Sequence, residues 1–313
     1  MKKSTFVIIV IVLMLFSCQK IENKEVNNEI NYGNLRGKMA FSNEKHKITI
    51  IDFDSKSFSE VTPKDNAIIW NGTVSLSPDG EKISYAGYSD GYQGYQIFTM
   101  SCKGGDFNQL TKSISGFTEH YTSPIWNYDG SKIYYLEAGL IIGGPVFSIS
   151  PNGENNTKIV DYGLLDRVDI SKNGEYLLMG FRDSNKGIYR YNIQKKSLEK
   201  LVSIDSSNYG YCPVFSPDES EIAYVLRHGI NDSGNPPYYF KIMIMNADGT
   251  DERTILTIDE NLYFGKLFVA WSPDGTKLAF NGSGNHIYTI NADGTELTQI
   301  TNYCCDAAPS WVK

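Results

Sequence analysis

The sequence predicts an all-β protein, a six-bladed β-propeller with four antiparallel strands in each blade, from three observations. A turn tetrapeptide recurs at intervals of about 49 residues, close to the 40–50 residues of a propeller blade. Short alternating apolar runs, typical of strands, surround each copy. The two ends of the chain complete each other's repeat. Together these features predict a closed ring of blades.

The recurring tetrapeptide is Ser-Pro-Asp-Gly. It occurs in full at residues 77–80 and 272–275 and in degenerate form at residues 127–130, 171–174 and 216–219. Pro presets φ for a turn, Asp bonds nearby backbone, and Gly accepts the strained last position. We therefore expect a hairpin turn between the first (A) and second (B) strand of each blade.

Three strands follow each turn. The alternation of the B runs is typical of half-buried strands. A third (C) run comes next, then a second turn that is clearest as Asn-Ala-Asp-Gly at residues 246–249 and 291–294. A fourth (D) run ends at a Thr or another small residue in several copies. The B runs are found at residues 82–86, 132–136, 221–225 and 277–281.

The ends of the chain settle the number of blades. Residues 37–62 supply strands B, C and D without a strand A, and residues 308–312 form a strand A with nothing after it. We expect the C-terminal strand to join the first blade. This closure gives six blades and removes two sheet edges that would otherwise be open to aggregation.

This pattern resembles the TolB-like, or WD40-like, propeller repeat, in which Ser-Pro-Asp-Gly is followed by Lys-Ile-Ala-Phe, Ile-Tyr, Asp-Gly and Leu-Thr. The resemblance covers residues 37–313. It implies the fold, but many functions share that fold. TolB itself carries an additional N-terminal α/β domain, and we expect no room for one here. The resemblance therefore does not extend to the role of TolB in the Tol system.

The N-terminus predicts a lipoprotein signal peptide at residues 1–17. Two Lys precede an apolar run at residues 6–16, which is too short to span a bilayer and has the length of a signal-peptide core. Leu15, Ser17 and Cys18 resemble a bacterial lipobox, which implies cleavage before Cys18 and lipidation of Cys18. The alternative is an ordinary signal peptide that happens to contain a Cys.

Residues 18–34 are expected to form the lipidated Cys and a flexible tether, because they are rich in Asn and Glu and have no apolar period. Residues 35–313 then form the propeller. These features predict a lipid-anchored protein of the cell envelope, with a periplasmic or surface-exposed globular part. Gln19 replaces the Asp of the inner-membrane retention signal, and this favours the outer membrane.

The charge of the chain limits its partners. The sequence has 29 Lys and Arg against 36 Asp and Glu, a net charge of −7. An acidic body argues against nucleic acid and against anionic membrane as partners. We expect a monomer that contacts the membrane through its lipid anchor only. Cys304 and Cys305 are adjacent and could form a strained vicinal bridge or remain two buried thiols.

The longest and most varied segments predict a binding face. In a four-stranded blade, the B–C and D–A connections share one face of the disc and the A–B and C–D turns share the other. The B–C and D–A segments are long here, and variable loops on a rigid scaffold often carry binding. Many of their residues are aromatic, and Tyr is enriched in binding hot spots. The alternative is that these rings pack the loops down.

The candidate ligand-binding residues on that face come from D–A and B–C connections and from the residues just before each strand A. Thr73, His120, Arg167, Tyr211, Phe268 and Asp306 are expected to line the central funnel. A funnel with Arg, His and Asp would suit a small polar or anionic ligand. The full candidate set is His120, Tyr121, Arg167, Tyr209, Tyr211, Tyr238, Tyr239, Tyr263 and Asp306.

The predicted function is a non-catalytic binding module for a protein or glycan. The alternative is a propeller enzyme, such as a polysaccharide lyase or lactonase, working in the funnel. A TolB-like lyase that acts on oligogalacturonate has a His-rich metal site there. The four His of this chain show no i, i+2 or i, i+4 ligand spacing, so we predict neither a metal nor a cofactor, and no catalytic residues.

Overall fold

The computed structural model describes most of the chain from residue 32 onward. Residues 1–31, which contain the predicted signal peptide, Cys18 and most of the tether, lie outside the described residues. The described ranges are 32–43, 45–63, 68–88, 94–112, 120–138, 143–161, 165–181, 186–205, 208–228, 239–259, 267–302 and 308–313. In these ranges no helix has the length and apolar character needed to cross a membrane.

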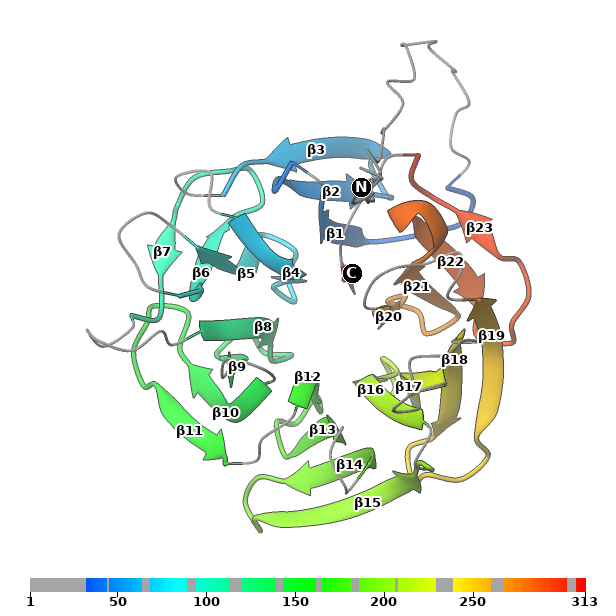
Figure 1. The fold of residues 1–313 in the computed structure, drawn as a ribbon. Helices are drawn as coiled ribbons and strands as arrows, with labels where there is room; N and C mark the ends of the chain where they lie inside the picture. The colour runs from blue at the N-terminus through cyan, green and yellow to red at the C-terminus, as the bar shows by residue number, and fades with distance from the viewer. Residues whose placement is uncertain are drawn as a thin grey trace, which may run out of the picture. The chain divides into compact units, whose positions relative to one another are not determined.

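The described strands form six four-stranded antiparallel blades arranged in a ring (Figure 1). The six-bladed all-β fold is therefore confirmed. Blades 3 and 4 also share a single bridge between Gly143 and Leu165. From the inside outward, the strands are β24 (Ser310–Val312), β1 (Lys38–Ser42), β2 (Ile48–Asp52) and β3 (Ser57–Val61) in blade 1; β4 (Ile68–Leu76), β5 (Lys82–Tyr88), β6 (Gln96–Ser101) and β7 (Asn108–Gln109) in blade 2; β8 (His120–Trp126), β9 (Ile133–Ala138), β10 (Gly143–Ile149) and β11 (Thr157–Val160) in blade 3; β12 (Leu165–Ile170), β13 (Tyr176–Phe181), β14 (Gly187–Asn192) and β15 (Ser197–Ser203) in blade 4; β16 (Asn208–Phe215), β17 (Glu221–His228), β18 (Tyr239–Asn246) and β19 (Arg253–Asp259) in blade 5; and β20 (Val269–Trp271), β21 (Lys277–Asn281), β22 (Ile287–Asn291) and β23 (Thr298–Gln299) in blade 6, with a 3-10 turn, η3 (Ser283–Asn285), between β21 and β22.

The Ser-Pro-Asp-Gly segments are the A–B turns, and their side chains hold the turn together. In blade 2, the Ser77 hydroxyl donates to Asp79 Oδ1 at 2.5 Å, and the Lys82 N–H donates to Ser77 Oγ at 2.9 Å. Gly80 has a φ of 66°, in the left-handed region that favours Gly. The copy at residues 272–275 makes the same bonds, so a local sequence signal fixes the same turn in different blades.

The degenerate copy in blade 5 places Glu219 where the full motif has Gly. Glu219 adopts a φ of 61°, which costs a non-Gly residue about 1 kcal/mol. Its carboxylate accepts a hydrogen bond of 2.5 Å from the backbone N–H of Lys172 in the A–B turn of blade 4. The substitution therefore links two neighbouring turns on the same face of the ring.

The hydrophobic core lies between blades. The described residues form six buried clusters, each of which combines residues of two adjacent blades, and together the clusters follow the whole ring. The expectation of half-buried strands is wrong for the inner part of each blade. In β5, for example, every residue from Ile83 to Gly87 is buried, because neighbouring blades cover both faces of the sheet. Small polar side chains such as Ser84 occupy the alternate positions.

The ring closes as expected, through the C-terminal strand. β24 is antiparallel to β1, with Trp311 opposite Met39. The Trp311 ring is buried and its centroid lies 5.5 Å from that of Phe53. Its indole N–H donates to the Arg36 carbonyl at 2.8 Å. The cluster around Trp311 also contains Ile287 of blade 6, so one C-terminal side chain connects the first and last blades.

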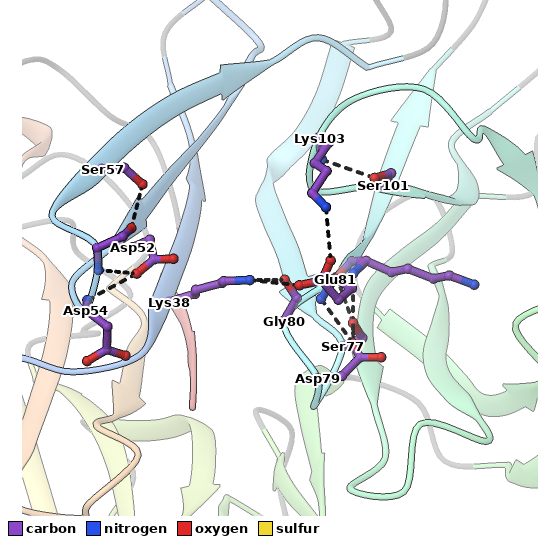
Figure 2. A network of polar contacts seen from close by, with 12 residues as sticks. Lys38, Asp52, Asp54, Ser57, Ser77, Asp79, Gly80, Glu81, Ser101 and Lys103 are labelled. Carbon is purple, nitrogen blue, oxygen red and sulfur yellow. Dashed lines mark hydrogen bonds and ion pairs between the residues drawn. The ribbon is translucent and has the colours of Figure 1, made fainter.

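A polar network connects blade 1 to blade 2 beside this closure (Figure 2). The Lys38 ammonium of β1 donates to the Gly80 carbonyl at 3.2 Å and pairs with Glu81 at 3.0 Å. The Glu81 carboxylate also lies 3.8 Å from the Lys103 ammonium. The bond to Glu81 raises the pKa of Lys38. These partly exposed pairs contribute modestly, about 0–1 kcal/mol each, and they keep the A–B turn of blade 2 against β1.

Candidate functional site

A cavity of about 600 Å³ lies at the centre of the ring, and all six blades contribute to its wall. Its described lining comes from the C-terminal parts of the inner strands and from the A–B turns that follow them. We call it the central cavity. Its wall includes Ser310 and Lys313 of blade 1, Leu76 and Pro78 of blade 2, Trp126 and Tyr128 of blade 3, Arg167 and Asp169 of blade 4, Phe215 and Pro217 of blade 5, and Trp271 and Pro273 of blade 6.

The position of this lining shows which face the central cavity reaches. The A–B turns lie on one face of the ring, and the wall contains the Ser-Pro-Asp-Gly turn of blade 6 and turn residues of its neighbours. The predicted binding face is the opposite one, formed by the B–C and D–A connections. Residues 89–93, 139–142, 229–238 and 260–266 of that face lie outside the described residues.

Arg167 enters the central cavity because of its place in β12. Val168 and Ile170 belong to the hydrophobic cluster between blades 3 and 4, so the strand alternation sends Arg167 and Asp169 to the other side, where both line the central cavity. Arg167 is only 8% exposed, and its guanidinium lies 6.0 Å from the centre of the Phe268 ring. Its Nη1 atom is buried and has no hydrogen-bond partner among the described residues.

Asp169 is the second charged group of the wall. Its Oδ2 accepts a hydrogen bond of 2.8 Å from the backbone N–H of Phe215 in blade 5. Burial raises the pKa of Asp169 to about 6, against the opposing effects of its backbone hydrogen bonds and of the Arg167 charge. The carboxyl group therefore changes its charge just below neutral pH, and it offers an acceptor above that pH and a donor below it.

The mouth of the central cavity carries an aromatic and cationic pair. Tyr128, in the A–B turn of blade 3, is 40% exposed, and the Lys172 ammonium of blade 4 lies 5.5 Å from the centre of its ring. Partial burial of the phenol, reinforced by the negative charges of Asp169 and Glu219, raises the pKa of Tyr128. The phenol is therefore neutral at physiological pH and can donate a hydrogen bond.

Three tryptophans of the wall differ in their indole hydrogen bonds. Trp271 donates to the Val214 carbonyl at 3.3 Å, and Trp311 donates to the Arg36 carbonyl at 2.8 Å. The Nε1 atom of Trp126 is buried and has no hydrogen-bond partner among the described residues. Buried donors are almost always bonded in folded proteins. Among the described residues, one donor of Trp126 and one of Arg167 are exceptions.

Two predicted site residues begin β8, at the end of the strand away from the central-cavity turns. The backbone N–H of Tyr95 donates to His120 Nδ1 at 3.3 Å, and the two rings lie 5.5 Å apart. Tyr121 stands perpendicular to Tyr135 at 5.5 Å between centroids. Both His120 and Tyr121 are half-buried.

The remaining predicted residues are spread over blade 5 and beyond. Tyr211 is buried in the core and accepts a hydrogen bond from the Leu267 N–H at 3.2 Å. Tyr239 stacks on His228 with centroids 4.3 Å apart. The backbone of Tyr209 lies in β16. Cys18, Tyr238, Tyr263 and Asp306 lie outside the described residues.

Among the predicted candidate residues, the described structure places Arg167 in the wall of the central cavity. The structure adds Asp169, Trp126 and Tyr128, which the sequence analysis did not select. One signal could have found Asp169, because it follows Arg167 by two residues and must share its side of the strand. Trp126 immediately precedes the A–B turn of blade 3 and Tyr128 lies within it, whereas the sequence analysis sought the binding site on the opposite face.

The described residues contain no group of three or more His, Cys, Asp or Glu side chains placed to hold a metal ion. His228 of β17 is instead close to Asn208 Oδ1, with its Nδ1 atom at 2.5 Å. His286 lies beside Gly284 in the turn before β22. These two His therefore lie in different blades.

Comparisons with known proteins agree on the fold. No protein-family model matches the chain, and no curated protein does. Among solved structures, TolB from Acinetobacter baumannii is similar at 17% identity, with a TM-score of 0.69, over 89% of this chain and 67% of that one. A putative TolB from Agrobacterium tumefaciens is similar at 16% identity, with a TM-score of 0.57, over 72% of this chain and 91% of that one.

An enzyme also appears among the similar structures. An oligogalacturonate lyase in complex with manganese is similar at 12% identity, with a TM-score of 0.55, over 82% of this chain and 70% of that one. At sequence identities this low, structural similarity supports a shared architecture and not a shared activity. On its repeat, its six closed blades and these similarities, the chain has the fold of a TolB-like six-bladed β-propeller.

Proposed function

We propose that this protein is a non-catalytic binding module of the cell envelope, and that its ligand enters the central cavity from the face of the A–B turns. The observation that carries this proposal is the central cavity itself, where Arg167 and Trp126 each carry a buried donor without a hydrogen-bond partner among the described residues. A concave site with a few converging polar groups is the usual form of a binding site. This places the ligand on the face opposite the one that loop variation favours.

The size and lining of the central cavity support a ligand that enters end-on. A volume of about 600 Å³ lies in the range of small-molecule sites, about 300–1,000 Å³. Its wall alternates polar groups, such as Arg167 and Asp169, with apolar ones, such as Phe215 and Trp271. The rings supply contact area and the polar groups supply orientation. A small molecule or the end of a larger chain fits this description.

The envelope location rests on the sequence. The lipobox ending at Cys18 supports a lipid anchor, and Gln19 favours the outer membrane. We expect Cys18→Ser to move the protein from the detergent phase to the aqueous phase in a Triton X-114 partition of whole cells. The wild-type chain with Gln19→Asp should keep its anchor. A Cys18→Ser protein that stays in the detergent phase contradicts the lipid anchor.

The binding role is tested by capture from an envelope extract on immobilised protein, with a glycan array in parallel. Two exposed tyrosines form a matched pair. Tyr128, at 40% exposed, lies at the mouth of the central cavity, and Tyr88, at 39% exposed, ends β5 on the opposite face. We expect Tyr128→Ala to reduce capture at least five-fold and Tyr88→Ala to leave it unchanged. If Tyr88→Ala abolishes capture and Tyr128→Ala does not, the binding site lies on the loop-rich face instead.

An enzyme is the second candidate, and one observation favours it. Burial raises the pKa of Asp169 to about 6, which is close to the value that suits a general base near neutral pH. Arg167 lies two residues away in the same wall and could hold an anionic substrate. Mass spectrometry of a captured glycan or peptide before and after incubation distinguishes the two roles. A new product that Asp169→Asn no longer forms would establish the enzyme.

A further inference from the structure

Among the described residues, two side chains that line the central cavity each carry a buried donor without a partner, and this deepens the proposed function, on which the inference rests. The donors are Nη1 of Arg167 in blade 4 and Nε1 of Trp126 in blade 3. A buried donor left unbonded costs about 1–3 kcal/mol, and more when it carries charge. Both side chains line the central cavity, and an occupant that supplies acceptors would satisfy their donors.

The charge of Arg167 narrows the chemistry of that acceptor. A guanidinium presents its donors in a planar fork that matches a carboxylate or a phosphate. Asp169 stands two residues away in the same wall, where its negative charge disfavours a doubly charged group more than a singly charged one. A carboxylate therefore fits better than a phosphate.

The other acids of the wall are already bonded. Asp218 accepts from the Ser216 and Ser220 hydroxyls, and Asp274 accepts from the Ser272 and Thr276 hydroxyls. Glu221 pairs with Arg253 at 2.7 Å. None of these carboxylates contacts Arg167 in the described structure. The Arg167 charge does act on Asp169, but Nη1 of Arg167 has no hydrogen-bond partner among the described residues and can bond an incoming group.

The rest of the wall indicates what the carboxylate is attached to. Four prolines from the turns and inner strands surround the central cavity together with aromatic and aliphatic side chains. Burying an apolar group of a ligand against such a surface contributes favourable binding free energy, whereas a strongly hydrated group contributes little there. The apolar members include Leu76, Phe215, Pro217, Trp271, Pro273 and Pro309.

We infer that the central cavity takes the free carboxylate of a ligand with an apolar body, as at the C-terminus of a peptide, with Arg167 as its ion-pair partner and Trp126 Nε1 as a second donor. A peptide end meets the requirements for charge, apolar body and end-on entry together. A sugar acid meets the first requirement and lacks the apolar body. The probes used below distinguish a peptide end from a sugar acid.

The test titrates the protein with N-acetyl-phenylalanine, with N-acetyl-phenylalanine amide and with galacturonate, followed by calorimetry and by the indole N–H resonances. The first two probes differ only in the carboxylate. Trp126→Phe assigns the Trp126 resonance. We expect the acid to bind and to shift that resonance. The amide and galacturonate should bind at least ten-fold more weakly.

Variants connect the binding to Arg167. Arg167→Gln should lower the affinity for N-acetyl-phenylalanine at least ten-fold, and Arg167→Lys should restore part of it. Arg190→Gln is the matched control, because Arg190 lies in the same blade, pairs with Glu199 at 2.8 Å and does not line the central cavity. Thermal melting confirms that each variant is folded. The comparison of acid with amide stays decisive in the wild-type protein if Arg167→Gln fails to fold.

Several results would overturn the inference. They are equal binding of acid and amide, unchanged affinity in a folded Arg167→Gln, tighter binding of galacturonate than of N-acetyl-phenylalanine, or no shift of the Trp126 resonance with any probe. Capture from extract that still depends on Tyr128 would then show that the proposed function stands and only the ligand chemistry is wrong. Absence of capture would instead remove the proposed function.

Discussion

Trp311→Ala tests the closure of the ring with one substitution. Trp311 lies in β24, packs on Phe53 of blade 1 and shares a buried cluster with Ile287 of blade 6. Its indole N–H also donates to the Arg36 carbonyl at 2.8 Å. If the C-terminal strand completes blade 1, removing this side chain weakens the contact between the first and last blades, and with it the whole ring.

The expected cost follows from the burial of the indole. Replacing a buried Trp by Ala costs about 3–5 kcal/mol in the free energy of unfolding, so we expect about 4 kcal/mol. At about 2–4 °C for each kcal/mol in domains of 150–250 residues, the melting temperature should fall by about 8–16 °C. Trp311→Phe keeps the apolar ring and loses the N–H, so it should cost about 1–2 kcal/mol.

The assay is thermal and urea unfolding followed by circular dichroism and Trp fluorescence. Leu297→Ala serves as the control, because Leu297 is 52% exposed and such surface changes stay within about 0.5 kcal/mol. Deletion of residues 306–313 should lower the stability further or abolish the cooperative transition. A melting temperature of Trp311→Ala within about 2 °C of the wild type would refute the closure through β24.

Three further predictions concern single side chains. Burial raises the folded-state pKa of Asp169 to about 6, above its ordinary value of 3.8. The folded state then binds more protons between these values, so this group makes stability fall as pH rises from 4 to 7. Asp169→Asn should remove this pH dependence, which amounts to about 3 kcal/mol at most in the free energy of unfolding between pH 4 and pH 7. If the variant and the wild type have identical pH profiles, Asp169 is not buried as described. Gly180→Ala should destabilise by about 1–3 kcal/mol in urea unfolding, because its Cβ would lie 2.8 Å from the Gly210 carbonyl oxygen of blade 5; an unchanged midpoint would show that the two strands are further apart. Burial raises the pKa of the Cys102 thiol to about 12, so native protein at pH 8 should react with iodoacetamide far more slowly at Cys102 than unfolded protein does. Peptide mass spectrometry measures this, and equal rates would place the thiol at the surface.

The fold followed from local patterns that repeat. The turn at residues 77–80 needs only its own Ser, Pro, Asp and Gly, and the same bonds recur at residues 272–275. The period-two runs predicted the strands, and the incomplete first and last repeats predicted the closure. Glu219 could not be predicted in this way, because its left-handed conformation is offset by a bond to the turn of another blade.

The candidate site followed from the sequence only in part. Arg167 could be placed near the axis because it was expected just before an inner strand, although it lies within that strand, β12, in the structure. Other residues of the cavity wall, such as Trp126 and Phe215, belong to other blades and lie 40 or more residues from Arg167 in the sequence. No local pattern brings them together. Tyr211 was expected to line the funnel, but it is enclosed in the core beside Leu267 of blade 6. No local pattern predicts that contact either.

The sequence by itself determined the number of blades and the turn chemistry, because each depends on residues that are close in the chain or on simple repetition. It also predicts lipidation at Cys18, on the same kind of local pattern. Only the tertiary structure decided where the unfilled space and the unused donors lie. Side chains pack between adjacent blades around the ring, while a cavity of about 600 Å³ remains where the inner strands meet. Arg167 and Trp126 therefore face a cavity whose existence depends on all six blades at once.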